Sequence, residues 1–198
     1  MGGGARGPRR PPARGAPPVR GRVDGLAAWY DGPVRRRDPA RADRLLAALA
    51  RSRADGARGE PLGPALLAAW QRIVLGVPEA PLRDTDAFAK GGRERYGLTP
   101  HTWRDFADCL RESADPAVPL PARAARVYLD ITFFHPFTDG NARLALLALA
   151  HVLDLEGIRL DEVGPLPVAR YADDADGAAD LAVLVAVLIR ATRRRAGT

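Results

Sequence analysis

The chain has 198 residues, a length that suits one domain, and 46% of them are hydrophobic, which is enough for a single core. A single cysteine, Cys109, excludes an internal disulfide and any cysteine-based metal motif. The net charge is +6, yet 29 arginines stand against one lysine, a bias typical of GC-rich codon usage. Because no helix-turn-helix, zinc or base-stacking pattern accompanies this charge, nucleic-acid recognition is not the expected function.

The first 22 residues consist almost wholly of Gly, Pro, Arg and Ala, without apolar periodicity. Such a composition predicts a disordered tail over residues 1–22, followed by one folded domain over 23–198. The tail lacks the apolar core of a secretory signal, so a cytoplasmic location is expected.

Four apolar segments follow with the length and spacing of helices, and no β-rich stretch rivals them, so the sequence predicts an all-α fold. The last segment is too short to span a bilayer and is expected to be a buried core helix, which means that no membrane partner is expected. The segments contain Leu45, Leu46 and Leu49; Leu66, Leu67, Trp70, Ile73 and Val74; Trp103, Phe106 and Leu110; and residues 178–189.

Residues 77–97 interrupt this helical pattern. They are polar, contain Gly91 and Gly92 in succession, and lack helical periodicity. This composition predicts a long ordered loop or a short hairpin, with an exposed connector as the alternative.

The most informative segment is HPFTDGNAR at residues 135–143, which lies between two apolar helical runs. It is predicted to be a short loop that opens a helix. Gly140 permits backbone dihedrals that other residues avoid. The N–H groups of the three following residues then point out of the first helical turn, with the positive end of the helix dipole behind them. This arrangement predicts a binding site for a phosphate group.

The side chains of this loop suit nucleotide chemistry. Arg143 offers a fixed positive fork to a second phosphate, and Asn141 can donate a hydrogen bond to a phosphate oxygen. Asp139 is an oxygen ligand beside the phosphate site, as Mg²⁺ requires. His135 can accept a hydroxyl proton near neutral pH.

Each of these residue types also has an ordinary structural explanation. A histidine beside aromatic residues is commonly a core residue, an Asp-Gly pair commonly a turn, and an asparagine before a helix commonly a cap. Pro136 and Phe137 are expected to be structural, the first stiffening the loop and the second anchoring it in the core. The combination at this spacing favours the functional interpretation.

The segment resembles the active-site loop of the Fic (Fic/Doc) family, whose pattern is HPFx(D/E)GN(G/K)R. The likeness extends upstream through PARAARVYLDITFF and downstream through LALLALAHVLDLEGI, and a weaker likeness covers residues 64–165. The resemblance implies an all-helical bundle with a short β-hairpin flap over the active site. It also implies transfer of AMP from ATP to a hydroxyl side chain of a target protein, called AMPylation.

The family roles fall on particular residues of this chain. His135 would be the general base, Asp139 would hold Mg²⁺, and the phosphates of the co-substrate ATP would lie against the turn formed by residues 140–143, that is Gly140, Asn141, Ala142 and Arg143. The hydroxyl would come from a Ser, Thr or Tyr of the target, and a separate inhibitory, antitoxin-like protein would be a further partner. Residues 77–97 would form the flap, in which the candidates for contact with target or nucleotide are Phe88, Lys90, Arg93 and Arg95.

Two positions depart from the family pattern. Ala142 replaces the Gly of most AMP-transferring members and the Lys of Doc-like phosphotransferases. Both AMP transfer and phosphate transfer therefore stay open. AMP transfer is favoured because the charge of the lysine is missing. Leu146 replaces a second arginine that binds the terminal phosphate in many members. No inhibitory (S/T)xxxE(G/N) motif is found, since Glu156-Gly157 has Val152 where Ser or Thr is needed. A non-catalytic nucleotide-binding or nucleic-acid-binding module is the remaining alternative.

Overall fold

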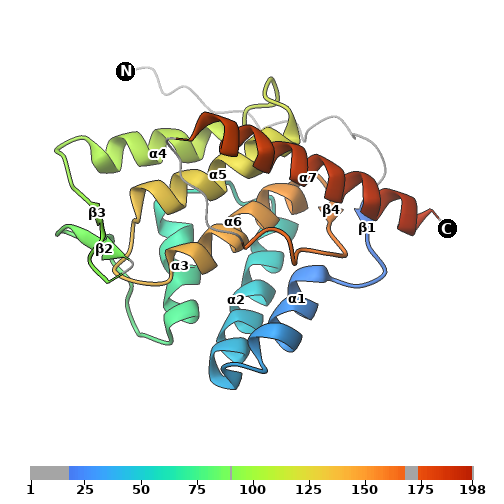
Figure 1. Cartoon of the computed structure of the whole chain (residues 1–198), viewed down its shortest axis with the longest axis horizontal. Coiled ribbons are helices and arrows are strands. Elements are labelled where there is room, and N and C mark those ends of the chain that lie inside the picture. The colour runs from blue at the N-terminus through green and yellow to red at the C-terminus, as the bar shows by residue number, and fades with distance from the viewer. Residues whose placement is uncertain (1–17, 90, 168–173, 198) are drawn as a thin grey trace, which may run out of the picture.

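The computed structural model describes residues 18–89, 91–167 and 174–197. Within them the fold is all-α, as predicted, with two pairs of short strands (Figure 1). The helical elements are α1 (Gly25–Trp29), the π-helical turn η1 (Tyr30–Val34), α2 (Pro39–Ala57), α3 (Pro64–Leu75), α4 (Thr102–Glu112), α5 (Leu120–Phe134), α6 (Asn141–Leu155) and α7 (Ala175–Ala196). The strands are β1 (Val19–Arg20), β2 (Ala87–Ala89), β3 (Glu94–Tyr96) and β4 (Ile158–Arg159).

Helix α6 is the centre of the bundle. It packs against α5, α2 and α3, while α7 and α4 pack on α5 (Figure 1). Its residues from Leu144 to Leu149 are all buried, which is the pattern of a helix surrounded by others on every side. The loop before α6 is therefore attached to a helix that lies in the centre of the core.

The three helices predicted before the Fic-like segment are confirmed as α2, α3 and α4. The C-terminal helix is longer than expected, because Asp174 caps its N-terminus by accepting from the N–H of Gly177 at 3.0 Å. It is also less buried than expected, since Val183 and Val187 lie on an exposed face. None of the helices that the structure describes has the length and apolarity needed to cross a bilayer.

A short strand, β1, lies within the segment that the composition assigned to the tail. Val19 pairs with Ile158 and Arg20 with Arg159, so that β1 and β4 form a short parallel ladder. This ladder lies before the predicted boundary at residue 22, and its hydrogen bonds satisfy backbone groups of a segment with tail-like composition. Residues 1–17 lie outside the described residues.

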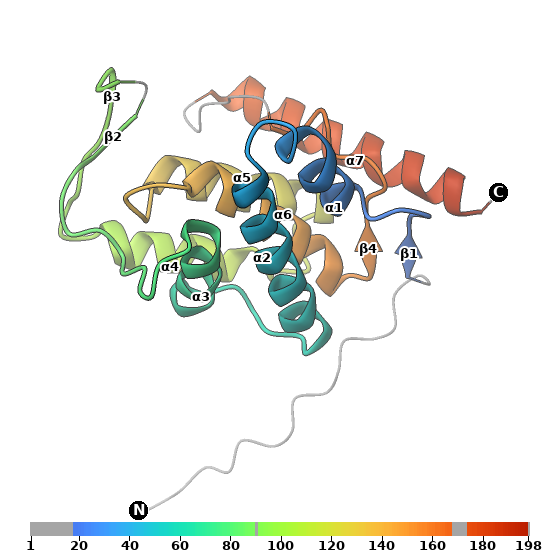
Figure 2. The same cartoon turned by 90° about the horizontal axis from the view of Figure 1, so that it is seen from below.

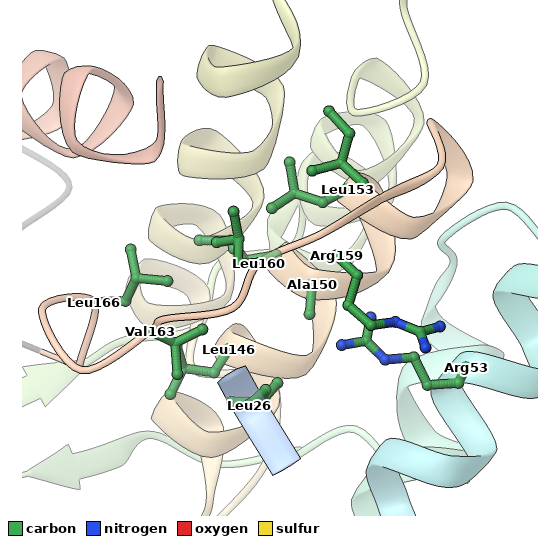
Figure 3. A pocket seen from close by; sticks show the side chains of 11 residues that line it. Leu26, Arg53, Leu146, Ala150, Leu153, Arg159, Leu160, Val163 and Leu166 are labelled. Atoms are coloured by element: carbon green, nitrogen blue, oxygen red, sulfur yellow. The ribbon is translucent and has the colours of Figure 1, made fainter. Parts of the chain in front are cut away.

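Helix α1 is fixed to α2 and α6 by a cluster of charged side chains. Asp24 caps α1 and pairs with Arg53 of α2 at 3.1 Å, and Arg53 also pairs with Asp154 of α6. Arg159 lies 3.7 Å from Asp24 and 3.6 Å from Asp154. Figure 3 shows the Arg53 and Arg159 side chains meeting beside an otherwise apolar pocket into which Leu26 of α1 points. These ion pairs fix the position of α1, which together with η1 forms one wall of a cleft.

Candidate active site

The loop between α5 and α6 has the predicted form. Helix α5 ends at Phe134, and His135 follows in the left-handed region with φ 45°, its N–H donating to the carbonyl of Ile131. A non-glycine residue with positive φ is uncommon and is held only where its surroundings fix it. His135 is the single such residue in the described part of the chain.

Gly140 ends the loop and is required there for two reasons. Its φ is 78°, which glycine adopts without strain. A Cβ at this position would also lie 2.7 Å from Nε2 of Gln71 and 3.2 Å from Cδ2 of Leu75. Helix α6 therefore begins against the side chains of α3.

The side chain of Asn141 closes the loop on itself. Its Nδ2 donates to the carbonyl of Phe137 at 2.8 Å, and its Oδ1 accepts from the N–H of Phe137 at 3.0 Å. Both residues are buried, which confirms Phe137 as the anchor of the loop. One of the two Nδ2 N–H donors is therefore used on the loop backbone, and the predicted donation to a phosphate oxygen would fall to the other. The backbone N–H of Asn141 is a further donor.

The first turn of α6 is open. The first intrahelical bond here runs from the N–H of Leu144 to the carbonyl of Gly140 at 3.0 Å, and the N–H groups of Asn141, Ala142 and Arg143 have no partner among the described residues. They border a cleft of about 290 Å³, the His135 cleft. Its other lining residues are Phe88, Ala89, His135, Thr138, Asp139 and Gly140. Open N–H groups at a helix N-terminus favour an anion.

The tautomer of His135 follows from its hydrogen bond. Its Nδ1 lies 2.7 Å from the carbonyl oxygen of Thr132, and a carbonyl only accepts, so Nδ1 carries the proton and Nε2 has the free lone pair. Burial lowers the pKa of the imidazole, and the nearby Arg83 charge lowers it further, against the opposing effect of the Thr132 bond. His135 is therefore a neutral base at pH 7.

A β-hairpin lies over this loop, as predicted. Strands β2 and β3 are antiparallel, with Ala87 opposite Tyr96 and Ala89 opposite Glu94 (Figure 2 shows the pair extending from the bundle). The ring of Tyr96 stacks on that of His135, with centroids 3.6 Å apart and an interplanar angle of 22°. The hairpin is therefore part of the site rather than an exposed connector.

The four flap candidates are placed differently. Phe88 is 61% exposed and lines the His135 cleft. Arg95 pairs with Asp86 at 2.6 Å beside the hairpin, so its charge is already matched. Arg93 is not among the described residues that line the cleft, and Lys90 lies outside the described residues.

Asp139 and Arg143 form an ion pair at the mouth of the cleft. Nη2 of Arg143 lies 2.9 Å from Oδ2 of Asp139, and Oδ1 accepts from the N–H of Gly140 at 2.6 Å. The Asp139 side chain is 75% exposed. The described residues contain no cluster of three or more His, Cys, Asp or Glu side chains that could hold a metal by itself. A single exposed carboxylate beside a phosphate site fits Mg²⁺, which keeps several waters and takes its other ligands from phosphates.

Comparison with known proteins agrees with this geometry. The family model Fic/DOC family matches residues 62–153, which include the hairpin, the loop and most of α6. Residues 62–153 belong to the Fic/DOC family. No curated protein matches the chain in sequence.

Solved structures of Fic proteins share the fold. A Fic domain-containing signaling protein from Bacteroides thetaiotaomicron superposes with a TM-score of 0.58 at 18% identity, over 77% of this chain and 69% of that one. A fragment of Fic-1 from C. elegans superposes with a TM-score of 0.50 at 18% identity, over 78% of this chain and 49% of that one. The chain thus spans about half of the Fic-1 fragment.

Arg83 lies outside the Fic motif and was not predicted from the sequence, yet it binds the backbone at the start of the loop. Its guanidinium is buried and donates to the carbonyls of His135 at 2.6 Å, Thr85 at 2.6 Å and Phe134 at 3.1 Å. The backbone N–H of Arg83 donates to the carbonyl of Pro136 at 3.0 Å. Burial lowers its pKa. A cation at the C-terminal end of α5 also matches the helix dipole. One arginine among 29 gave no signal of this role.

Gln71 of α3 is the second residue that sequence reasoning missed. It is fully buried, and its Nε2 donates to the backbone carbonyl of Asp139. A glutamine next to Trp70 in an otherwise apolar helix face was the available signal. Together, Arg83 and Gln71 fix the two ends of the Fic loop.

Proposed function

We propose that this Fic protein transfers AMP from ATP to a Ser, Thr or Tyr hydroxyl of a target protein. The observation that carries the proposal is one cleft in which an imidazole with a free Nε2 lone pair faces the open first turn of α6. Family membership supports a transferase of this general type.

The step that fits this geometry is an in-line displacement at the α-phosphorus. Nε2 of His135 takes the proton of the target hydroxyl, whose oxygen bonds to the α-phosphorus. The bond from that phosphorus to the bridging oxygen of the β-phosphate breaks, and pyrophosphate leaves. The N–H groups of α6 and the guanidinium of Arg143 stabilise charge on the phosphate oxygens.

Asp139 is the residue proposed to hold Mg²⁺. Its carboxylate is exposed, lies beside the phosphate site and can turn from Arg143 to a metal, since the Asp139–Arg143 pair is at the surface. When bound, Mg²⁺ would neutralise charge on the phosphates. Arg143 would then be released to the nucleotide.

The hairpin is proposed to bind the target. An exposed strand edge can add an extended peptide by backbone hydrogen bonds, and Phe88 offers an apolar contact next to the cleft. The hydroxyl of a side chain on such a peptide would approach His135. A separate inhibitory protein that covers the same edge would block the reaction.

The experiment is to incubate the full chain with a cell lysate and α-labelled ATP, and to identify labelled proteins by mass spectrometry. We expect transfer to be lost in His135→Ala and Mg²⁺-dependent transfer to be lost in Asp139→Ala. Arg143→Ala should weaken ATP binding by roughly 1.5 to 3 kcal/mol, the contribution of a charge-assisted hydrogen bond. Equal labelling with wild type and His135→Ala would refute the proposal. ATP binding with no modification of any protein would favour a non-catalytic module.

A further inference from the structure

A second cleft adjoins the His135 cleft. Its volume is about 550 Å³, and it lies between α1, η1 and the start of α2 on one side and α5 and α6 on the other. Ala142 and Arg143 line both clefts. A molecule whose phosphate lies at the first turn of α6 can therefore extend from one cleft into the other.

The second cleft is positively charged. Arg37, Arg41 and Arg143 line it, and none of its described lining residues is acidic. Arg41 pairs with Asp38 at 3.2 Å, a carboxylate that also caps α2. Arg37 has no carboxylate within ion-pair distance in the described part of the chain. Three arginines that line one cleft favour a ligand with several negative charges.

The wall of this cleft contains a polar atom without a partner. Tyr30 is 1% exposed, and its hydroxyl makes no hydrogen bond to any described residue. Tyr30 belongs to the wide turn η1, where the N–H of Arg35 donates to the Tyr30 carbonyl at 3.0 Å and Pro33 contributes no N–H. A buried hydroxyl without a partner is costly, and an anionic oxygen in the cleft would satisfy it.

The residue of α6 that faces this cleft one turn after Ala142 and Arg143 cannot bind an anion. It is Leu146, which is buried and lines both this cleft and the apolar pocket behind it (Figure 3). Beyond Arg143, the cations available to a phosphate here come from a different part of the chain, the segment between η1 and the first turn of α2.

We propose that Arg37 and Arg41 bind the terminal phosphate of a nucleoside triphosphate in this second cleft. The proposal rests on the proposed function, because it takes the first phosphate to lie at the open turn of α6. The η1–α2 segment then selects a triphosphate over a monophosphate. It gives the N-terminal part of the fold, which precedes the residues matched by the family model, a direct role in substrate choice.

The test is calorimetric titration of the full chain with ATP, AMP and pyrophosphate. The variant is Arg37→Ala combined with Arg41→Ala, and the matched control is Arg36→Ala combined with Arg104→Ala, two exposed arginines that remove the same charge without lining the cleft. Losing charge-assisted contacts should weaken ATP binding at least about tenfold in the first variant. AMP binding should change by less than about threefold in both variants, as expected from long-range charge alone.

Each other outcome is informative. Equal ATP affinity in the two double variants would overturn the proposal, and so would an equal loss of ATP and AMP affinity, which would place the nucleoside in this cleft instead. Pyrophosphate separates this proposal from the proposed function. Pyrophosphate that binds wild type and is lost in the Arg37 and Arg41 variant supports the cleft assignment even if no target is ever labelled. Normal labelling by that variant at low ATP overturns the cleft assignment and leaves the proposed function intact.

Discussion

The ring of Tyr96 stacks on the imidazole of His135 at 3.6 Å, so the hairpin covers one face of the proposed base. Tyr96 is part of β3, and β3 is held to β2 by the antiparallel ladder. Any movement of the hairpin therefore changes the hydration of His135. Because burial is the main cause of the lowered pKa of His135, the position of the hairpin and the protonation of the base are linked.

Removing the Tyr96 ring should raise the pKa of His135. In Tyr96→Ala the imidazole gains water on its covered face, which favours the charged form, whereas Tyr96→Phe keeps the ring and should leave the pKa unchanged. NMR titration of the His135 ring protons measures both. A pKa that is equal in Tyr96→Ala and Tyr96→Phe would show that the stack does not control hydration.

The pH dependence of transfer should reflect the same shift. A His pKa lowered in the folded protein keeps the neutral base populated below the ordinary value of about 6.5, so activity should fall only at more acidic pH. The acid limb of kcat/KM against pH gives the midpoint for the free enzyme. A midpoint at or above about 6.5 would contradict the burial of the base that the structure shows.

The left-handed backbone of His135 predicts a difference in stability between two variants that lack the imidazole. At φ 45°, glycine avoids the strain that a Cβ causes, so His135→Gly should be more stable than His135→Ala by about 1 kcal/mol. Neither variant should transfer AMP, because both lack the imidazole. Urea denaturation of the two variants, with equal m-values as the control for two-state unfolding, measures the difference. If the alanine variant were the more stable of the two, the left-handed conformation would be wrong.

Arg83 should matter for both stability and catalysis. Arg83→Ala leaves the carbonyls of Phe134, His135 and Thr85 without their donor, and we expect a loss of about 2 to 4 kcal/mol in the free energy of unfolding. Arg83→Lys should recover only part of the lost stability, since an ammonium group cannot span three carbonyls as a planar guanidinium does. Arg104→Ala, at an exposed position, is the control and should be nearly neutral.

A lowered kcat in Arg83→Lys, measured where the protein is still folded, would support the role of Arg83 in positioning the loop. An unchanged kcat together with lowered stability would limit Arg83 to a structural role. Thermal unfolding followed by circular dichroism defines the temperature range in which this comparison is valid.

The sequence predicted those features of the site that depend on local chemistry. The helix-loop-helix around residues 135–143 follows from two apolar runs and Gly140. The polar segment with Gly91 and Gly92 left a loop and a hairpin open, and the resemblance to the Fic flap favoured the hairpin. These signals are contained within a few neighbouring residues, so a single sequence was enough to read them.

What the sequence did not predict depends on contacts between distant segments. Gln71 lies 68 residues before the carbonyl that it donates to, and Arg83 lies 51 and 52 residues before the carbonyls of Phe134 and His135. The contact of the Asn141 side chain with the preceding loop was missed for a related reason. An asparagine at the start of a helix can bind a ligand or the preceding loop, and only the fold shows that the amide is turned to Phe137.

In the proposed function, Ala142 lies at the position where AMP transfer and phosphate transfer can be distinguished. Its methyl group is exposed at the first turn of α6 and borders both clefts, and it adds no charge to the phosphate site. If the α-phosphate lies at this turn, the target becomes labelled by α-labelled ATP and stays unlabelled by γ-labelled ATP. Ala142→Gly should then preserve or raise transfer, whereas Ala142→Lys should depress it, because a long cation would occupy the position of the phosphate. Labelling from the γ position alone would mean that the nucleotide binds in the reverse direction, and the enzyme would then be a Doc-like phosphotransferase.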